Sequence, residues 1–102
     1  MDLSSSAIQR TWYAIAPDGT EGPVTFQVGL PIEQPDGEWG VRVSLGDIEP
    51  TIPFIFGVDG WQAVVLGMRF ISARVSDLSE RGWHFFWVKG GDSAGPSDLN
   101  FD

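Results

Sequence analysis

Apolar and polar residues alternate along two segments in the first half of the chain, with the period of a half-buried strand. Residues 24–30 alternate valine, phenylalanine and leucine with threonine, glutamine and glycine, and residues 39–45 repeat this kind of pattern. Pro-Asp-Gly precedes each segment, at residues 17–19 and 35–37, and favours a tight turn because glycine permits positive φ. We therefore predict an antiparallel pair of strands with one face exposed to water.

Three further segments are predicted as strands. Residues 8–16 predict a first strand. Residues 51–58 predict a strand that Pro53 interrupts, and because proline cannot donate to a ladder, we expect an edge or bulged strand. Residues 83–88 predict a last strand with apolar side chains on both of its faces.

Residues 57–82 predict one amphipathic helix with both ends marked. Asp59 is a good N-cap, and Gln62 can reach back to it as in a capping box. Arg81 suits the C-terminal end of the helix dipole, and Gly82 supplies a left-handed exit. Apolar residues recur three and four apart, so one stripe is expected to face the core. The stripe comprises Trp61, Val64, Val65, Met68, Ile71, Val75 and Leu78.

These elements predict an α+β fold, an antiparallel sheet of four to five strands packed on one long helix in the order β-β-β-β-α-β. We expect residues 1–102 to form a single domain, with residues 1–7 and 90–102 as loose ends. One helix covers one face of a sheet, so His84 and Phe86 would lie on the face away from it. That aromatic patch either forms an interface or is covered by the segment after residue 90.

Composition narrows the class of protein. The chain is 42% hydrophobic and 13% aromatic, which is ample for a core. It has no cysteine, so disulfides and thiolate metal sites are excluded. The first residues lack the pattern of a signal peptide, and no apolar run approaches the length of a membrane span. We therefore expect a cytoplasmic protein that does not enter the membrane.

The net charge is −8, and nearly all of it belongs to the strand region. Residues 1–59 hold nine acids and two bases. Such a surface repels nucleic acid and anionic lipid, which excludes the usual nucleic-acid-binding classes. It would steer a basic protein toward it over about 8 Å in physiological salt. The alternative is that the charge serves solubility alone.

No constellation of residues indicates catalysis. His84 is the only histidine and lies between aromatic residues on a predicted strand, which favours a structural role. No serine lies in a G-x-S-x-G elbow. Asp47 and Glu49 would point the same way in extended chain, but they lack calcium-loop spacing and a third ligand. The tryptophans fall in predicted strands or the helix, which favours core packing over sugar stacking. We predict no catalytic residue, metal or cofactor.

The segment from Gly57 to Arg69 carries a resemblance. It reads GVDGWQAVVLGMR and resembles short bacterial proteins of unknown function in which a G-x-D-x-x-Q-A run opens one long helix after a few strands. A tryptophan-bearing strand and a Gly-Asp tail follow in those proteins, as Trp87, Gly91 and Asp92 do here. Gly67 and Met68 stand where that pattern has alanine and leucine. The resemblance implies a similar fold and no activity.

We predict a non-enzymatic protein-binding module, of the inhibitor or immunity type, that docks on a basic partner. Five carboxylates would steer the partner, and one of two aromatic side chains would anchor it. The carboxylates belong to Glu33, Asp36, Glu38, Asp47 and Glu49, and the candidate anchors are Trp39 and Phe86. The alternative is a protein that forms a homodimer through its aromatic sheet face. A third reading is an enzyme that uses His84 with a nearby carboxylate.

Overall fold

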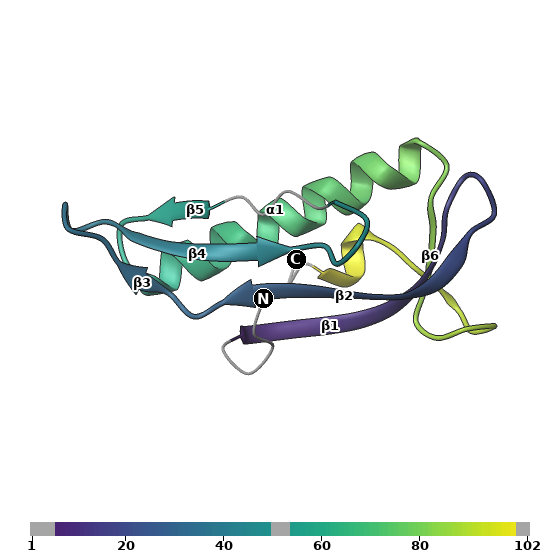
Figure 1. The fold of residues 1–102 in the computed structure, drawn as a ribbon, viewed down its shortest axis with the longest axis horizontal. Coiled ribbons are helices and arrows are strands. Elements are labelled where there is room, and N and C mark those ends of the chain that lie inside the picture. The colour runs from purple at the N-terminus through teal and green to yellow at the C-terminus, as the bar shows by residue number, and fades with distance from the viewer. Residues whose placement is uncertain (1–5, 50–53, 100–102) are drawn as a thin grey trace.

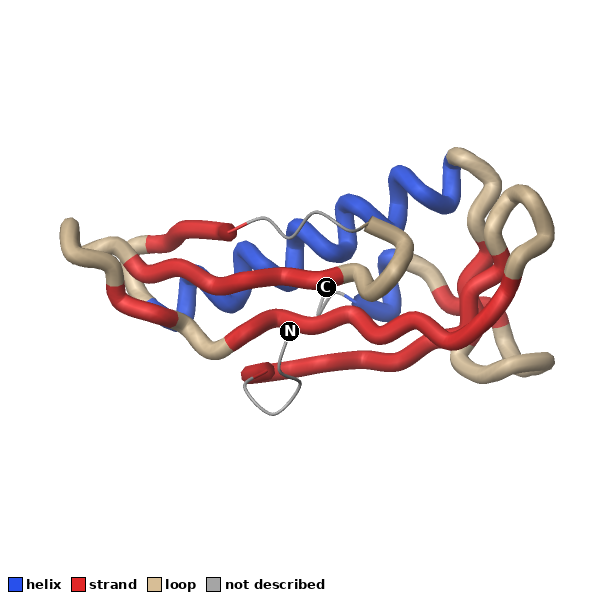
Figure 2. The backbone as a smooth tube through the Cα atoms, in the orientation of Figure 1, coloured by secondary structure: helices blue, strands red, loops and turns tan. Residues whose placement is uncertain are grey.

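A computed structural model describes residues 6–49 and 54–99, and within them an antiparallel seven-stranded sheet packs against one long helix (Figure 1). The predicted α+β class is therefore confirmed. The elements in chain order are β1 (Ser6–Ile15), β2 (Glu21–Gly29), β3 (Ile32–Glu33), β4 (Trp39–Ser44), β5 (Phe54–Gly57), α1 (Gly60–Glu80), β6 (His84–Phe86), β7 (Ser93–Ala94) and the 3-10 helix η2 (Pro96–Leu99). Figure 2 shows the helix lying behind the strands along the length of the molecule.

The sheet is built on two turns of Pro-Asp-Gly. The first joins β1 to β2 in a long hairpin, and Gly19 there has φ +89°. The second joins β3 to β4, and Gly37 there has φ +91°. The predicted pairing of the two alternating segments is confirmed as β2 against β4, with Val28 opposite Val43. β5 pairs with β4 as well, so β4 has β2 and β3 along one edge and β5 along the other (Figure 1).

The core lies between the sheet and α1. An aromatic cluster fills one part of it, where Trp12 meets Phe26 edge to face at 5.5 Å and Phe85 packs beside both. Apolar side chains of β2 and β4 fill the rest, and they alternate with polar ones on the opposite face. As expected, the exposed His84 and half-buried Phe86 fall on that opposite face, across from Ile15 and Tyr13, whereas Phe85 faces the core.

The ends of α1 are held as the sequence predicts. The Asp59 carboxylate accepts a hydrogen bond from the Gln62 backbone N–H at 2.8 Å. The Gln62 side chain reaches back to the Val58 N–H at 2.8 Å, one residue before the N-cap. Arg81 is the C-cap, and Gly82 with φ +102° takes the left-handed conformation that ends the helix. The first turn is therefore fixed before any tertiary contact is considered.

The predicted apolar stripe is wrong at the start of the helix. Trp61 was placed in the core, but 83% of it is exposed to solvent. Ala63 and Gly67 are buried there instead. A Cβ atom at Gly67 would lie 3.1–3.2 Å from methyl groups of Val28, Val41 and Val43, so only a residue without a side chain allows the helix to come this close. The helix is rotated so that its smallest residues meet the sheet.

The segment after residue 90 was expected to be loose, and this is wrong for its described part. β7 pairs with β6, with Ala94 opposite Phe85. η2 follows, and Leu99 packs against the core. β7 therefore extends the sheet at its edge and does not cover the aromatic face. The ladder of β1 likewise begins at Ser6, inside the predicted loose N-terminal end. Pro53, expected to interrupt a strand, lies outside the described residues.

Replacing Gly67 by leucine tests the close approach of helix and sheet. We expect Gly67→Leu to lower the free energy of unfolding by about 2–3 kcal/mol, because overpacking against three valines outweighs the gain in helix propensity. Ala73→Leu, at an exposed position of the same helix, is the control and should change it by less than about 0.5 kcal/mol. Urea unfolding measures both. Equal stability of the two variants would contradict the packing described.

Candidate functional site

The structure divides the seven predicted site residues among three places. Glu33, Asp36, Glu38 and Trp39 lie at the turn between β3 and β4. Asp47 and Glu49 follow the other end of β4, which is roughly 17 Å away at about 3.3 Å per residue. Phe86 is on β6, and β2 and β1 lie between that strand and β4 in the sheet. One partner surface therefore does not contain all seven.

The turn between β3 and β4 is rigid and acidic. Gln34 N–H donates to the Glu38 carbonyl at 2.7 Å, and Gly37 N–H donates to the Gln34 carbonyl at 3.0 Å. The Asp36 carboxylate accepts from the Glu38 N–H at 2.9 Å. The side chains of Glu33, Asp36 and Glu38 are all exposed, and within the described residues none of them forms an ion pair. Their negative charge is thus available to a partner.

Trp39 does not fit the predicted role of anchor. It is half-buried and packs against the core. Its indole also supports the start of α1, because a Cβ atom at Gly60 would lie 3.6 Å from it. Trp39 therefore packs between the acidic turn and the helix, and this contact occupies the side that an anchor would present to a partner.

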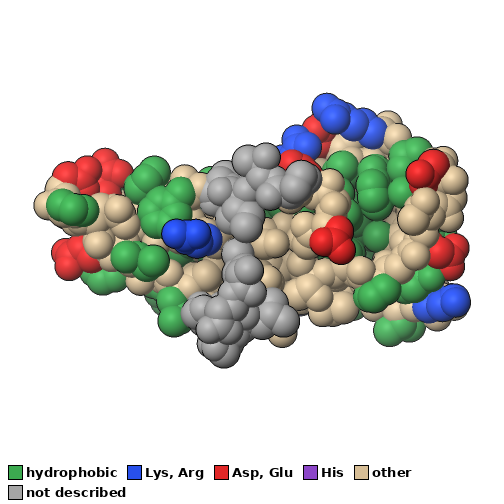
Figure 3. Space-filling model, viewed as in Figure 1, with side chains coloured by type: hydrophobic (Ala, Val, Ile, Leu, Met, Phe, Trp, Pro, Cys, Tyr) green, Lys and Arg blue, Asp and Glu red, His purple; other side chains and the backbone are tan. Residues whose placement is uncertain are grey.

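The exposed apolar side chains of this end were missed by the sequence analysis. Ile32 and Phe56 both lie opposite Gly40 in the ladder, so they share the face away from the helix. Val58 is 73% exposed and Trp61 83% exposed, just beyond β5. We name this region the acidic end; Figure 3 shows acidic and hydrophobic side chains gathered there, on the left. It comprises Leu30, Ile32, Glu33, Asp36, Glu38, Phe56, Val58 and Trp61.

Glu49 is bound within the chain. It accepts a hydrogen bond from Arg74 Nε at 2.7 Å, and Arg74 Nη1 also donates to Asp77 at 2.7 Å. The Glu49 hydrogen bond raises the pKa of the Arg74 guanidinium, which stays charged. The Glu49 charge is compensated in this way, so it is a weak candidate for steering a partner. Asp47 remains exposed beside it.

Phe86 lies at the opposite end of the molecule from the acidic turn. It is half-buried and pairs with Tyr13 across the ladder. The Tyr13 hydroxyl donates to the Glu21 carboxylate at 2.6 Å, which raises the pKa of Tyr13 above its ordinary 10.0. The central part of this face is polar, with Thr11 and Thr25 hydroxyls hydrogen-bonded at 2.8 Å. An extended aromatic surface is therefore not formed there by the described strands.

No further chemistry emerges from the described part of the chain. His84 is exposed and forms no ion pair with an acid there. Three or more potential metal ligands do not gather anywhere among residues 6–49 and 54–99. In those same residues no helix is long and apolar enough to cross a membrane.

Comparison with known proteins adds no relative. No protein-family model matches the chain, and no curated protein or solved structure matches it. The resemblance of residues 57–69 to short bacterial proteins of unknown function stays a prediction. Function must therefore be argued from the surface itself.

Titration of Tyr13 tests the geometry of the sheet face. It is the only tyrosine, so phenolate absorbance reports it alone. We expect a midpoint above 10.0, moved back toward that value in Glu21→Gln. Because the folded pKa is raised, the stabilising contribution is present below pH 10 and is lost as pH rises through the folded value. A wild-type midpoint at or below 10.0 would contradict the hydrogen bond.

Proposed function

We propose that this protein is a non-enzymatic binding module of the inhibitor or immunity type, and that its acidic end docks on a basic protein. The observation that carries the proposal is Trp61. A tryptophan that is 83% exposed, on a helix whose first turn is fixed, is an unusual use of the largest apolar side chain. Exposed apolar patches rimmed by polar residues mark interaction sites.

The chemistry of the acidic end suits a basic partner. Tryptophan is the residue type most often found at the energetic centre of an interface. Ile32 and Phe56 add exposed apolar area on the sheet face away from the helix that carries Trp61, and Glu33, Asp36 and Glu38 provide uncompensated charge at the turn. The charge speeds encounter and selects a complementary partner, whereas the Trp61 indole supplies affinity when the partner buries it.

The acidic end is also pre-organised. Asp59 and Gln62 cap the helix on either side of Trp61, so the backbone that carries the indole is already ordered. The two backbone hydrogen bonds across the β3–β4 turn order the carboxylates in the same way. This side of the interface therefore loses little conformational entropy when a partner binds. A cytoplasmic location remains part of the proposal.

Homodimerisation through the aromatic sheet face is the second candidate, and the structure supports it less. The described centre of that face carries hydrogen-bonded threonines and glutamines, including Gln27 Nε2 to Gln9 Oε1 at 3.4 Å. Phe86 is only half-exposed at one side of it. Catalysis by His84 is favoured still less, since His84 forms no ion pair with a carboxylate of the described residues.

Substitution of Trp61 tests the anchor. After affinity capture from the native host lysate and identification of a basic partner, we expect Trp61→Ala to weaken that complex by about thirtyfold or more, because hot-spot residues contribute about 2 kcal/mol. Val88→Ala removes another exposed apolar side chain, outside the acidic end, and should leave affinity unchanged. Equal binding of wild type and Trp61→Ala would refute the proposed surface.

The two Pro-Asp-Gly turns give a matched test of the charge. Asp36→Asn with Glu38→Gln and Asp18→Asn with Glu21→Gln change the net charge equally at opposite ends of the molecule (Figure 1). We expect the first pair alone to slow association several-fold at low salt and to flatten its salt dependence. Equal effects of both pairs would show that overall charge matters, without a docking site at the acidic end.

A further inference from the structure

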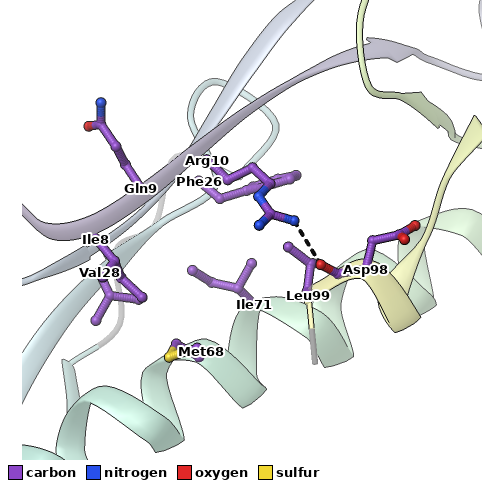
Figure 4. Close-up of a pocket in the computed structure, with 9 residues that line it drawn as sticks. All are labelled: Ile8, Gln9, Arg10, Phe26, Val28, Met68, Ile71, Asp98 and Leu99. Atoms are coloured by element: carbon purple, nitrogen blue, oxygen red, sulfur yellow. Dashed lines mark hydrogen bonds between the residues drawn. The ribbon is translucent and has the colours of Figure 1, made fainter. Parts of the chain in front are cut away.

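A pocket of about 380 Å³ lies between the first half of β1 and α1, beside the middle of the helix (Figure 4). Most of its wall is apolar. Those wall residues are Ile8, Phe26, Val28, Met68, Ile71 and Leu99. Arg10 supplies the polar side chain at its rim, because the side chain of Gln9 bonds Gln27 on the other face of the sheet and the Asp98 carboxylate points away (Figure 4). A concave apolar site with a few convergent polar groups is the usual form of a small-molecule site.

The fold explains why this space exists. β6 pairs with β1 only from Tyr13 to Ile15, so among the described strands the first half of β1 has a neighbour on its β2 side alone. Gly67 draws α1 toward β2 and β4. The helix is thereby kept off the start of β1, and η2 closes the space along its other side.

Arg10 is held at the rim of the pocket with its charge uncompensated. It lies opposite Phe26 in the ladder, so it projects to the helix side of the sheet. Its Nη1 donates to the backbone carbonyl of Asp98 at 2.7 Å, and its guanidinium carbon lies 5.0 Å from the centre of the Trp87 ring. A carbonyl and an aromatic ring orient a guanidinium without neutralising it.

The nearby carboxylate does not cancel this charge. Asp98 accepts a hydrogen bond from the Gly95 N–H at 2.9 Å, and Figure 4 shows its carboxylate directed away from the pocket. Arg10 forms no ion pair with any described residue. The remaining guanidinium N–H groups can therefore bind an anion at the entrance.

We propose that this pocket binds a small anionic amphiphile, with its carboxylate on Arg10 and its apolar body between β1 and α1. At roughly 30 Å³ per non-hydrogen atom, the share of a water molecule in the liquid, the pocket accommodates about thirteen such atoms, which is room enough for octanoate. The net charge of −8 opposes anions at long range, so recognition must come from direct contact with Arg10. This site is separate from the proposed partner surface.

Methyl NMR tests the proposal with octanoate as the probe. The chain has two methionines, so the Met68 methyl signal is readily assigned. We expect octanoate, below its micelle concentration, to shift this signal saturably. Octanol should bind at least about tenfold more weakly, because it lacks the charge-assisted hydrogen bond. Absence of a saturable shift, or equal binding of octanoate and octanol, would overturn the proposal.

Substitutions of arginine separate charge from packing. Arg10→Gln should reduce octanoate binding to the level of octanol and leave octanol unchanged. Arg10→Lys keeps the cation and should keep a preference for octanoate. Arg69→Gln makes the same change at an exposed helix position outside the pocket and should bind like wild type. Unchanged octanoate affinity in a folded Arg10→Gln protein would rule out the assigned role of Arg10.

Discussion

The contact on which the rest of this structure depends is the close approach of α1 to the sheet at Ala63 and Gly67. No side chain separates the helix at Gly67 from the valines of β2 and β4, and Ala63 is fully buried. Dispersion is strongest where atoms meet at van der Waals distance. The helix therefore turns the face with Ala63 and Gly67 to the sheet, and not the face with the larger Trp61. The helix rotates accordingly, and Trp61 is turned outward at its start while a pocket remains under β1 beside its middle, at Met68 and Ile71.

Local chemistry made much of the fold predictable. The caps of α1 depend on residues within three or four positions of each other, and Asp59, Gln62 and Gly82 act as expected. The turns depend on Pro-Asp-Gly alone. By contrast, the rotation of α1 depends on valines from two distant strands, and hydrophobic periodicity cannot weigh a glycine as a packing residue. β3 and β7 have two residues each, which is too short for an alternating pattern to show, and each is defined by its pairing with a neighbouring strand.

The candidate site likewise has features that depend on neighbouring residues and features that depend on distant ones. Glu33, Asp36 and Glu38 belong to one turn, so proximity in sequence was enough to group them. The pairing of Glu49 could not be read from the sequence, because its partner, Arg74, lies 25 residues later on the helix. Trp61 was misjudged because its side chain followed the stripe by spacing, and only the burial of Ala63 and Gly67 shows otherwise. Each residue turns a helix by 100°, so a shift of the predicted stripe by about one position is enough to move a side chain such as Trp61 from the core to the surface.

Solvent exposure of Trp61 is the measurement that tests this central relation most directly. The five indole N–H signals of the free protein can be followed by NMR while a soluble paramagnetic agent is added, with Trp61→Phe to assign the signal. We expect the Trp61 indole to broaden first and the Trp12 indole, which is 1% exposed, to broaden last. A Trp61 signal as protected as that of Trp12 would place the apolar stripe against the sheet, and would contradict both the packing of α1 and the surface built on it.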